Sequence, residues 1–163
     1  IHYPVQFELF PFTEAAIKKI KQKNIKLFSF TNQPVIAEGR ATEMDFINEL
    51  KTFGFDGMYL CSHSASEKCG CRKPQPGMLL TAAKDHKLNL VECVVMGDRW
   101  SDITAASYAG CLNILVKTGA GEAALNESRY LCEEIDPDYG AKDLHEAVDW
   151  LFNQPRFSKG EQE

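Results

Sequence analysis

Long apolar segments are missing from this sequence of 163 residues. No window of about 18 uninterrupted apolar residues occurs, so the sequence excludes a membrane-spanning helix and predicts no membrane partner. The first ten residues lack the basic start, the apolar middle and the small-residue cleavage site of a secretory signal. They also lack an initiator methionine, from which we expect a trimmed chain. With 44% hydrophobic and 25% charged residues, the composition is typical of one compact domain over residues 1–163.

An excess of basic residues is missing as well. The chain has 18 basic and 23 acidic residues and a formal net charge of -5. Residues 133–163 account for the imbalance, because they hold nine acidic and three basic residues. The remaining surface is nearly neutral and offers little general attraction to a nucleic-acid backbone. We therefore expect no nucleic-acid partner, and we expect any anion site to be a small pocket.

The cysteines lack the even spacing of a disulfide framework. They fall into a group of three, Cys61, Cys69 and Cys71, and three that stand singly, Cys93, Cys111 and Cys132. A chain of this length does not need disulfides to hold its core together. We interpret the single cysteines as buried free thiols. A reducing, cytoplasmic location fits this pattern best.

Strand and helix patterns alternate along the chain. Apolar runs predict strands over 25–30, 57–61, 93–97 and 112–116, with a final edge strand near 129–135. Helical patterns cover 13–23, 42–54, 77–86, 101–110 and 141–152. Thr42 and Asp45 resemble a capping box, and Ser101 is the expected cap of the helix that Gly110 ends. The predicted fold is α/β, a Rossmann-like three-layer arrangement of a parallel sheet with helices on both faces.

Polar clusters follow three of the predicted strands. These clusters are Thr31-Asn32-Gln33, the loop from Cys61 to Lys73, and the run from Gly97 to Asp102. Ligands of open α/β sheets gather beyond the carboxyl ends of the strands. We therefore expect the three loops to converge on one crevice.

The second cluster contains a C-x-H-x5-C-x-C pattern. Its members are Cys61, His63, Cys69 and Cys71. Four nitrogen and sulfur ligands are what a closed tetrahedral zinc site requires, and a filled ligand set indicates a structural role for Zn2+. The alternative is a reactive or disulfide-bonded cysteine loop with an incidental histidine.

Residues of opposite charge stand at two of the strand ends. Arg72 and Lys73 follow the last cysteine directly, and a planar guanidinium beside an ammonium suits a phosphate. Asp98 follows a strand and a glycine, which suits a ligand of Mg2+. The alternative for Asp98 and Thr31 is a simple turn or helix-capping role.

The motifs SFTNQPVIAEG, CSHSASEKCGCRKPQPGMLL and VVMGDRWSDI, followed by ILVKTGAG, resemble the zinc-containing branch of the haloacid dehalogenase-like phosphatases. This group includes heptose bisphosphate phosphatases and the histidinol-phosphate phosphatase domain. The resemblance covers most of the chain. It implies that Thr31 and Lys73 hold the transferring phosphoryl group and that Asp98 binds catalytic Mg2+. The implied substrate-binding residues are Asn32, Gln33, Arg72 and Arg99. Arg99 replaces the lysine that the family commonly has.

The resemblance also implies attack by an aspartate carboxylate, hydrolysis of the resulting aspartyl-phosphate, and a second acid that protonates the leaving oxygen. Both acids belong to an Asp-x-Asp-Gly motif on the family's first strand. The only Asp-x-Asp here is Asp136-Pro137-Asp138, in an acidic turn context without the glycine. We therefore expect the nucleophile strand upstream of Ile1, at the centre of the sheet. The printed chain alone is then expected to be inactive.

Three functional hypotheses follow. The leading one is a Mg2+-dependent phosphomonoesterase acting on a small phosphorylated metabolite of the sugar or histidinol phosphate type. A second is a catalytically inactive relative that serves as a binding or regulatory protein. A zinc-organised nucleic-acid module is disfavoured by the near-neutral surface. No large insertion is available for a cap domain, and we expect a monomer.

Overall fold

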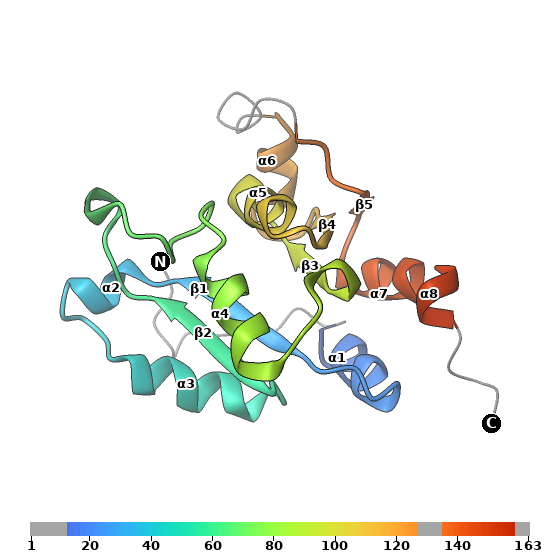
Figure 1. Ribbon diagram of the computed structural model, residues 1–163, viewed down its shortest axis with the longest axis horizontal. Helices are drawn as coiled ribbons and strands as arrows, with labels where there is room; N and C mark the ends of the chain where they lie inside the picture. The colour runs from blue at the N-terminus through green and yellow to red at the C-terminus, as the bar shows by residue number, and fades with distance from the viewer. Residues whose placement is uncertain (1–12, 127–134, 159–163) are drawn as a thin grey trace.

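The computed structural model describes residues 13–126 and 135–158 (Figure 1). Its strands are β1 Phe28–Asn32, β2 Gly57–Cys61, β3 Val94–Gly97, β4 Leu112–Val116 and β5 Tyr139–Ala141. Its α-helices are α1 Thr13–Gln22, α2 Pro34–Ala37, α3 Glu43–Thr52, α4 Gly77–His86, α5 Trp100–Ala109, α6 Gly121–Asn126, α7 Leu144–Phe152 and α8 Pro155–Ser158. Short 3-10 turns cover Ala65–Glu67 and Leu90–Glu92. No helix among these residues is long and apolar enough to cross a membrane.

All strand pairs are parallel, but they form two sheets. Strand β1 pairs with β2, and β3, β4 and β5 form a second sheet in that order. The α/β class with parallel strands is confirmed. Among the described residues β1 and β3 have one strand neighbour each, and these residues do not include the central strand that the sequence analysis expects upstream of Ile1. Side chains and helices connect the two sheets.

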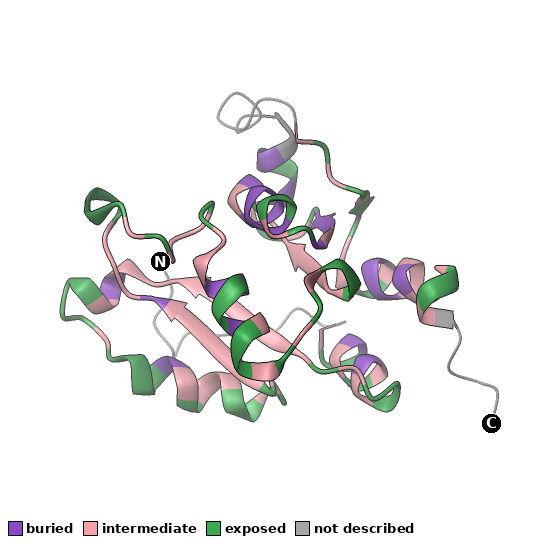
Figure 2. Cartoon of the chain, in the orientation of Figure 1, coloured by how far each residue is buried: buried purple, intermediate pink, exposed green. Residues whose placement is uncertain are grey.

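Helices cover both faces of the β3–β4–β5 sheet. On one face Leu115 packs against Trp100 and Ile103 of α5. On the other face Ile114 and Val116 pack with Ala147 of α7. This division follows from the alternation of side chains along β4. Helix α1 lies beside α7, and Met96 of β3 packs against the cluster that the two helices form (Figure 1). Both helices bear buried residues (Figure 2), so the layered arrangement predicted for the fold is present here.

Helix α3 begins and ends as the sequence predicts. The Thr42 side chain accepts a hydrogen bond from Asp45 N at 3.3 Å, and the Asp45 carboxylate accepts one from Thr42 N at 2.8 Å. This capping box satisfies backbone donors that a helix start leaves free. After the helix, Gly54 has φ +88°, a conformation that favours glycine.

Strand β1 begins later than the predicted strand over 25–30. Ile25 and Leu27 are apolar because they pack against the cluster formed by α1 and α7, not because they pair in a sheet. The backbone of Leu27 is satisfied by Asp56, whose carboxylate accepts from Leu27 N at 2.7 Å. The strand therefore runs to Asn32, and Thr31 lies within it.

Two further predictions are corrected. Ser101 does not cap α5, because the first residue outside the helix is Arg99 and its N–H donates to the Asp102 carboxylate at 3.1 Å. The edge strand expected near 129–135 falls on residues 127–134, which lie outside the described part, and Ile135 is not in a strand. The last strand of the described chain is β5, which the sequence did not predict.

Candidate active site and metal centre

The four predicted zinc ligands lie together after β2. Cys71 Sγ is 3.4 Å from Cys61 Sγ, 3.3 Å from Cys69 Sγ and 3.3 Å from His63 Nδ1. Cys61 Sγ is 3.5 Å from Cys69 Sγ and 3.6 Å from His63 Nδ1. All four ligand atoms are within 4.8 Å of one another. All three cysteines are free thiols, so the alternative of a disulfide in this loop is not observed.

This geometry fits a tetrahedral Zn2+. Zinc–sulfur bonds of about 2.3 Å and zinc–nitrogen bonds of about 2.0 Å place ligand atoms roughly 3.5–3.8 Å apart at the corners of a regular tetrahedron. The observed separations of 3.3–3.6 Å are within a few tenths of an ångström of those values. The donor set therefore matches a closed structural zinc site.

The crowded sulfurs perturb one another's protonation. Burial tends to raise the pKa of the Cys69 thiol, but hydrogen bonds from Cys71, from the backbone of Arg72 and from Cys61 outweigh it and lower this pKa to about 7. Burial and the neighbouring sulfurs raise the pKa of Cys71 to about 12. Without a metal, only one of these sulfurs therefore readily carries a negative charge. A divalent cation allows several thiolates to lie at such spacing.

The segment between β2 and α4, called the zinc loop after its predicted ligands, packs against the start of α4. The N–H of Gly77 donates to the carbonyl of Gly70 at 3.0 Å. A Cβ on Gly77 would lie 2.3 Å from that oxygen, so only glycine permits this approach. The loop is thus held at both ends, by β2 and by α4.

Lys73 connects the two sheets. Its ammonium donates to the carbonyl of Phe30 on β1 at 2.9 Å and to Asp102 on α5 at 2.5 Å. The two side chains of the ion pair are 15% and 8% exposed, so both charges are largely withdrawn from water. An ammonium in such a place is a fixed positive charge at the carboxyl ends of the strands.

Asn32 fixes the backbone of Lys73. The Asn32 amide oxygen accepts from Lys73 N at 3.1 Å, and the amide nitrogen donates to Lys73 O at 3.3 Å. Asn32 therefore positions the loop, and the substrate contact predicted for it stays a prediction. The loops after β1 and β2 thus meet, as the sequence predicts.

Thr31 and Gln33 also interact. The Gln33 amide donates to Thr31 Oγ1 at 2.7 Å, and Gln33 N donates to the carbonyl of Cys61 at 2.8 Å. Because Thr31 Oγ1 accepts from Gln33, its own proton is directed elsewhere and can serve an anion.

The two arginines differ in their surroundings. Arg72 Nη1 donates to the carbonyl of His63 at 3.2 Å, so the guanidinium is tied to the zinc loop. Arg99 is exposed at the start of α5. Arg72 is therefore held near the fixed charge of Lys73, whereas Arg99 reaches solvent.

Asp98 faces the loop that ends the ILVKTGAG motif. Its carboxylate accepts from Ala120 N at 2.9 Å, in the segment between β4 and α6. A Cβ on Gly119, which has φ +64°, would lie 2.5 Å from Asp98 Oδ2. A Cβ on Gly121 would lie 1.8 Å from the Val116 carbonyl. In the sequence, the pair of glycines in TGAG, shortly after the strand over 112–116, indicates this close approach of the backbone.

Asp102 is the functional residue whose role sequence reasoning missed. One carboxylate oxygen pairs with Lys73 and the other accepts from Arg99 N. Its side chain packs so close to Gly97 that a Cβ there would lie 2.4 Å from it. The sequence did indicate that Asp102 lies one turn into a helix and that this helix follows Asp98 at the end of a strand.

Asp136 and Asp138 do not join this group. Asp138 Oδ2 accepts from Asn113 N at 2.8 Å, and Asp138 N donates to the Asn113 side chain at 3.1 Å. Asn113 is the second residue of β4, so these bonds lie near the amino end of the strand, away from its carboxyl end. Asp138 therefore has a structural role at this end of the strand, apart from the residues that gather at the carboxyl ends.

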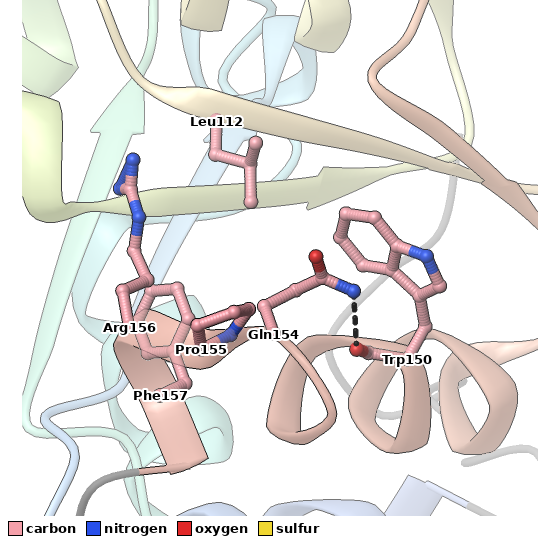
Figure 3. A pocket seen from close by; sticks show the side chains of 6 residues that line it. All are labelled: Leu112, Trp150, Gln154, Pro155, Arg156 and Phe157. Carbon is pink, nitrogen blue, oxygen red and sulfur yellow. Dashed lines mark hydrogen bonds between the residues drawn. The ribbon is translucent and has the colours of Figure 1, made fainter.

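A hollow of about 350 Å³ lies elsewhere in the molecule (Figure 3). It is lined by Leu112, Trp150, Gln154, Pro155, Arg156 and Phe157. Leu112 is the first residue of β4, so the hollow lies at the amino end of that strand. None of the predicted site residues lines it.

Known proteins share both the sequence and the fold. A family model described as HAD-hydrolase-like matches residues 70–147. A D-glycero-beta-D-manno-heptose-1,7-bisphosphate 7-phosphatase of Helicobacter pylori is 35% identical over 145 residues, which cover 83% of this chain and 78% of that protein. One from Haemophilus ducreyi is 32% identical over 147 residues, with coverage of 78% and 81%.

A crystal structure of D,D-heptose 1,7-bisphosphate phosphatase from B. bronchiseptica, complexed with magnesium and phosphate, has the same fold. Its TM-score is 0.81 at 25% identity, and the alignment covers 92% of this chain and 87% of that one. The chain belongs to the haloacid dehalogenase-like phosphatases. Within that class, the two relatives described above, which it matches over most of its length, are heptose-1,7-bisphosphate 7-phosphatases. The resemblance stated from the motifs is thereby confirmed.

Proposed function

We propose that the protein is a Mg2+-dependent phosphomonoesterase that acts on a small phosphorylated sugar. The observation that carries the proposal is the buried ammonium of Lys73, held between Phe30 and Asp102 at the carboxyl ends of the strands. A fixed cation in a partly dehydrated site stabilises charge on a transferring phosphoryl group more strongly than one in water. The names of the relatives point to a heptose bisphosphate as the substrate class.

In this proposal each residue has one role. Lys73 and the Thr31 hydroxyl hold the transferring phosphoryl oxygens, and Asn32 keeps the backbone of Lys73 in place. Gln33 orients the Thr31 hydroxyl by donating to its oxygen. Arg72 and Arg99 contact the remainder of the substrate. Asp102 is a positioning residue, because it holds the lysine through an ion pair and does not itself face the phosphate.

Asp98 is proposed as the ligand of catalytic Mg2+. A carboxylate at a strand end, with a glycine-rich loop against it, suits a hard cation. When bound, Mg2+ neutralises charge on the phosphate oxygens. Zn2+ is proposed on Cys61, His63, Cys69 and Cys71, where it rigidifies the loop that ends in Arg72 and Lys73.

The nucleophile is proposed to be an aspartate on a strand upstream of Ile1. Its carboxylate oxygen attacks phosphorus, the bond to the leaving oxygen breaks, and a second acid protonates that oxygen. Water then hydrolyses the aspartyl-phosphate. Two observations support this placement: β1 and β3 each have an edge without a strand partner in the described chain, and Asp138 of the Asp-x-Asp has a structural role.

Steady-state kinetics of the complete protein test the proposal. With a heptose bisphosphate and Mg2+, Lys73→Ala lowers kcat by roughly 10²–10³-fold, as expected for removal of one group that stabilises the transition state. Arg72→Ala lowers kcat less and raises KM, because its proposed contact is with the rest of the substrate. Lys84→Ala, an exposed lysine on α4, is the matched control. Wild-type kinetics for Lys73→Ala would refute the proposed role of the ammonium.

A further inference from the structure

Two cysteines outside the metal cluster stand side by side at the amino ends of β3 and β4. The strands pair in parallel with Val94 opposite Leu112. The ladder continues one position further back, because Leu112 N donates to the carbonyl of Cys93 at 3.0 Å. Cys93 therefore stands opposite Cys111. Neighbouring strands are about 4.8 Å apart, which is within the roughly 4.4–6.8 Å between Cα atoms of disulfides.

Both side chains project to the same face of the sheet. Side chains alternate along a strand, so Cys111 shares its face with Asn113 and Leu115, and residues opposite each other in a parallel pair share a face. That face is the one covered by α5, because Leu115 packs on Trp100 and Ile103. The two sulfurs therefore face the same layer from adjacent strands.

The two thiols also interact electrostatically. Burial raises the pKa of Cys111 to about 11, and the charge of Cys93 adds to the shift. Burial also raises the pKa of Cys93, with a contribution from Glu92. Both are free thiols. The mutual influence agrees with the adjacency that the strand register gives.

We propose that Cys93 and Cys111 form a reversible disulfide on exposure to a small-molecule disulfide. The Cys93 thiolate attacks one sulfur of the oxidant, forms a mixed disulfide and releases one thiolate. The Cys111 thiolate then attacks the Cys93 sulfur, closes the intramolecular bond and releases the second thiolate. Two protein thiols thus lose two electrons and two protons, and one oxidant disulfide becomes two thiols.

Access decides the order of the two attacks. Cys111 is 7% exposed, whereas Cys93 is half-buried and its Sγ lies 3.3 Å from the carbonyl of Asn89. The guanidinium of Arg156 donates to the carbonyl of Val91 at 2.7 Å, two residues before Cys93, so its positive charge lies near the negative charge of Glu92. The raised pKa of Cys93 makes the exchange slow at neutral pH, so the incubation lasts hours.

The disulfide between Cys93 and Cys111 would stabilise the fold and would lie outside the candidate active site. It closes a loop that contains the whole of α5 and with it Asp98 and Asp102, and loop closure stabilises by restricting the unfolded chain. The linkage lies at the amino ends of β3 and β4, whereas Asp98 follows the carboxyl end of β3. We expect the Tm of the oxidised protein to rise by about 5–10 °C.

Peptide mapping of the complete, zinc-loaded protein tests the proposal. After incubation with oxidised glutathione and removal of the excess, the protein is alkylated and digested with trypsin without reduction. Cleavage after Lys87, Arg99 and Lys117 gives peptides 88–99 and 100–117, and each contains one cysteine. The expected product is a disulfide-linked pair of these two peptides that disappears on treatment with dithiothreitol, together with the rise in Tm.

Cysteine variants separate this bond from other oxidation events. Cys93→Ser and Cys111→Ser each abolish the linked pair and the rise in Tm, and Cys111→Ser accumulates a glutathione adduct on Cys93. Cys132→Ser, which removes the third cysteine outside the metal cluster, is the matched control and retains both. Recovery of wild-type Cys93 as a stable glutathione adduct with Cys111 still free would overturn the proposal, as would linked peptides that join either cysteine only to the metal cluster. The outcome is independent of phosphatase activity.

Discussion

Removing the charge of Lys73 should destabilise the protein by about 3 kcal/mol. The Lys73→Met variant keeps most of the side-chain volume but leaves the Asp102 carboxylate, only 8% exposed, without its cation. Breaking a buried ion pair by removing one partner typically costs about 3–5 kcal/mol. The remaining hydrogen bond from Arg99 N and the 15% exposure of Lys73 put the expected value at the lower end.

A double-mutant cycle isolates the pair. Asp102→Asn removes the opposite charge, and the double variant contains no unpaired charge, so its loss should be smaller than the sum of the two single losses by about 1–3 kcal/mol. Urea denaturation followed by tryptophan fluorescence measures these values, because Trp100 is 4% exposed and two residues from Asp102. Lys84→Met on the exposed face of α4 is the control. Additive losses, or a loss below about 0.5 kcal/mol for Lys73→Met, would refute the reasoning.

Three further outcomes are expected. Elemental analysis of protein purified without added metal should find one zinc per chain, and Cys69→Ser should lower that content. A zinc content well under one per chain in the wild type would contradict the proposed zinc site. Asp98→Asn in the complete protein should raise the Mg2+ concentration needed for half-maximal activity at least about tenfold, and an unchanged Mg2+ titration would remove Asp98 from the metal site. The printed chain alone should not hydrolyse an aryl phosphate appreciably. Adding about 15–25 upstream residues that carry Asp-x-Asp should restore turnover. Robust activity of the printed chain would mean that the covalent mechanism is misassigned.

Local signals in the sequence predicted much of the fold. The strand over 57–61 and the helix over 77–86 were located to the residue, because an apolar run that starts at a glycine and a helical pattern behind Pro76 are short-range features. The cluster of three cysteines and one histidine was equally local, since its four residues lie within one short stretch of the chain. The capping box at Thr42 was predicted for the same reason.

Long-range partners could not be predicted in this way. Ile25 and Leu27 are as apolar as strand residues, and only their packing beside α1 and α7 reveals that they belong to no strand. The ion pair between Lys73 and Asp102 joins two separate elements, so no spacing along the chain indicates it.

The proposed zinc site and the proposed phosphate site share neighbouring residues, so we expect zinc retention to depend on whether phosphate is bound. Cys71 is a proposed zinc ligand, Arg72 donates to the carbonyl of His63, and Lys73 follows at once. Metal and anion would therefore order the same few residues. By thermodynamic reciprocity, any factor by which zinc tightens phosphate binding is the factor by which phosphate tightens zinc binding. Saturation with phosphate should thus shift the chelator concentration that strips the metal upwards, and a protein starved of zinc should lose affinity for phosphate before it unfolds.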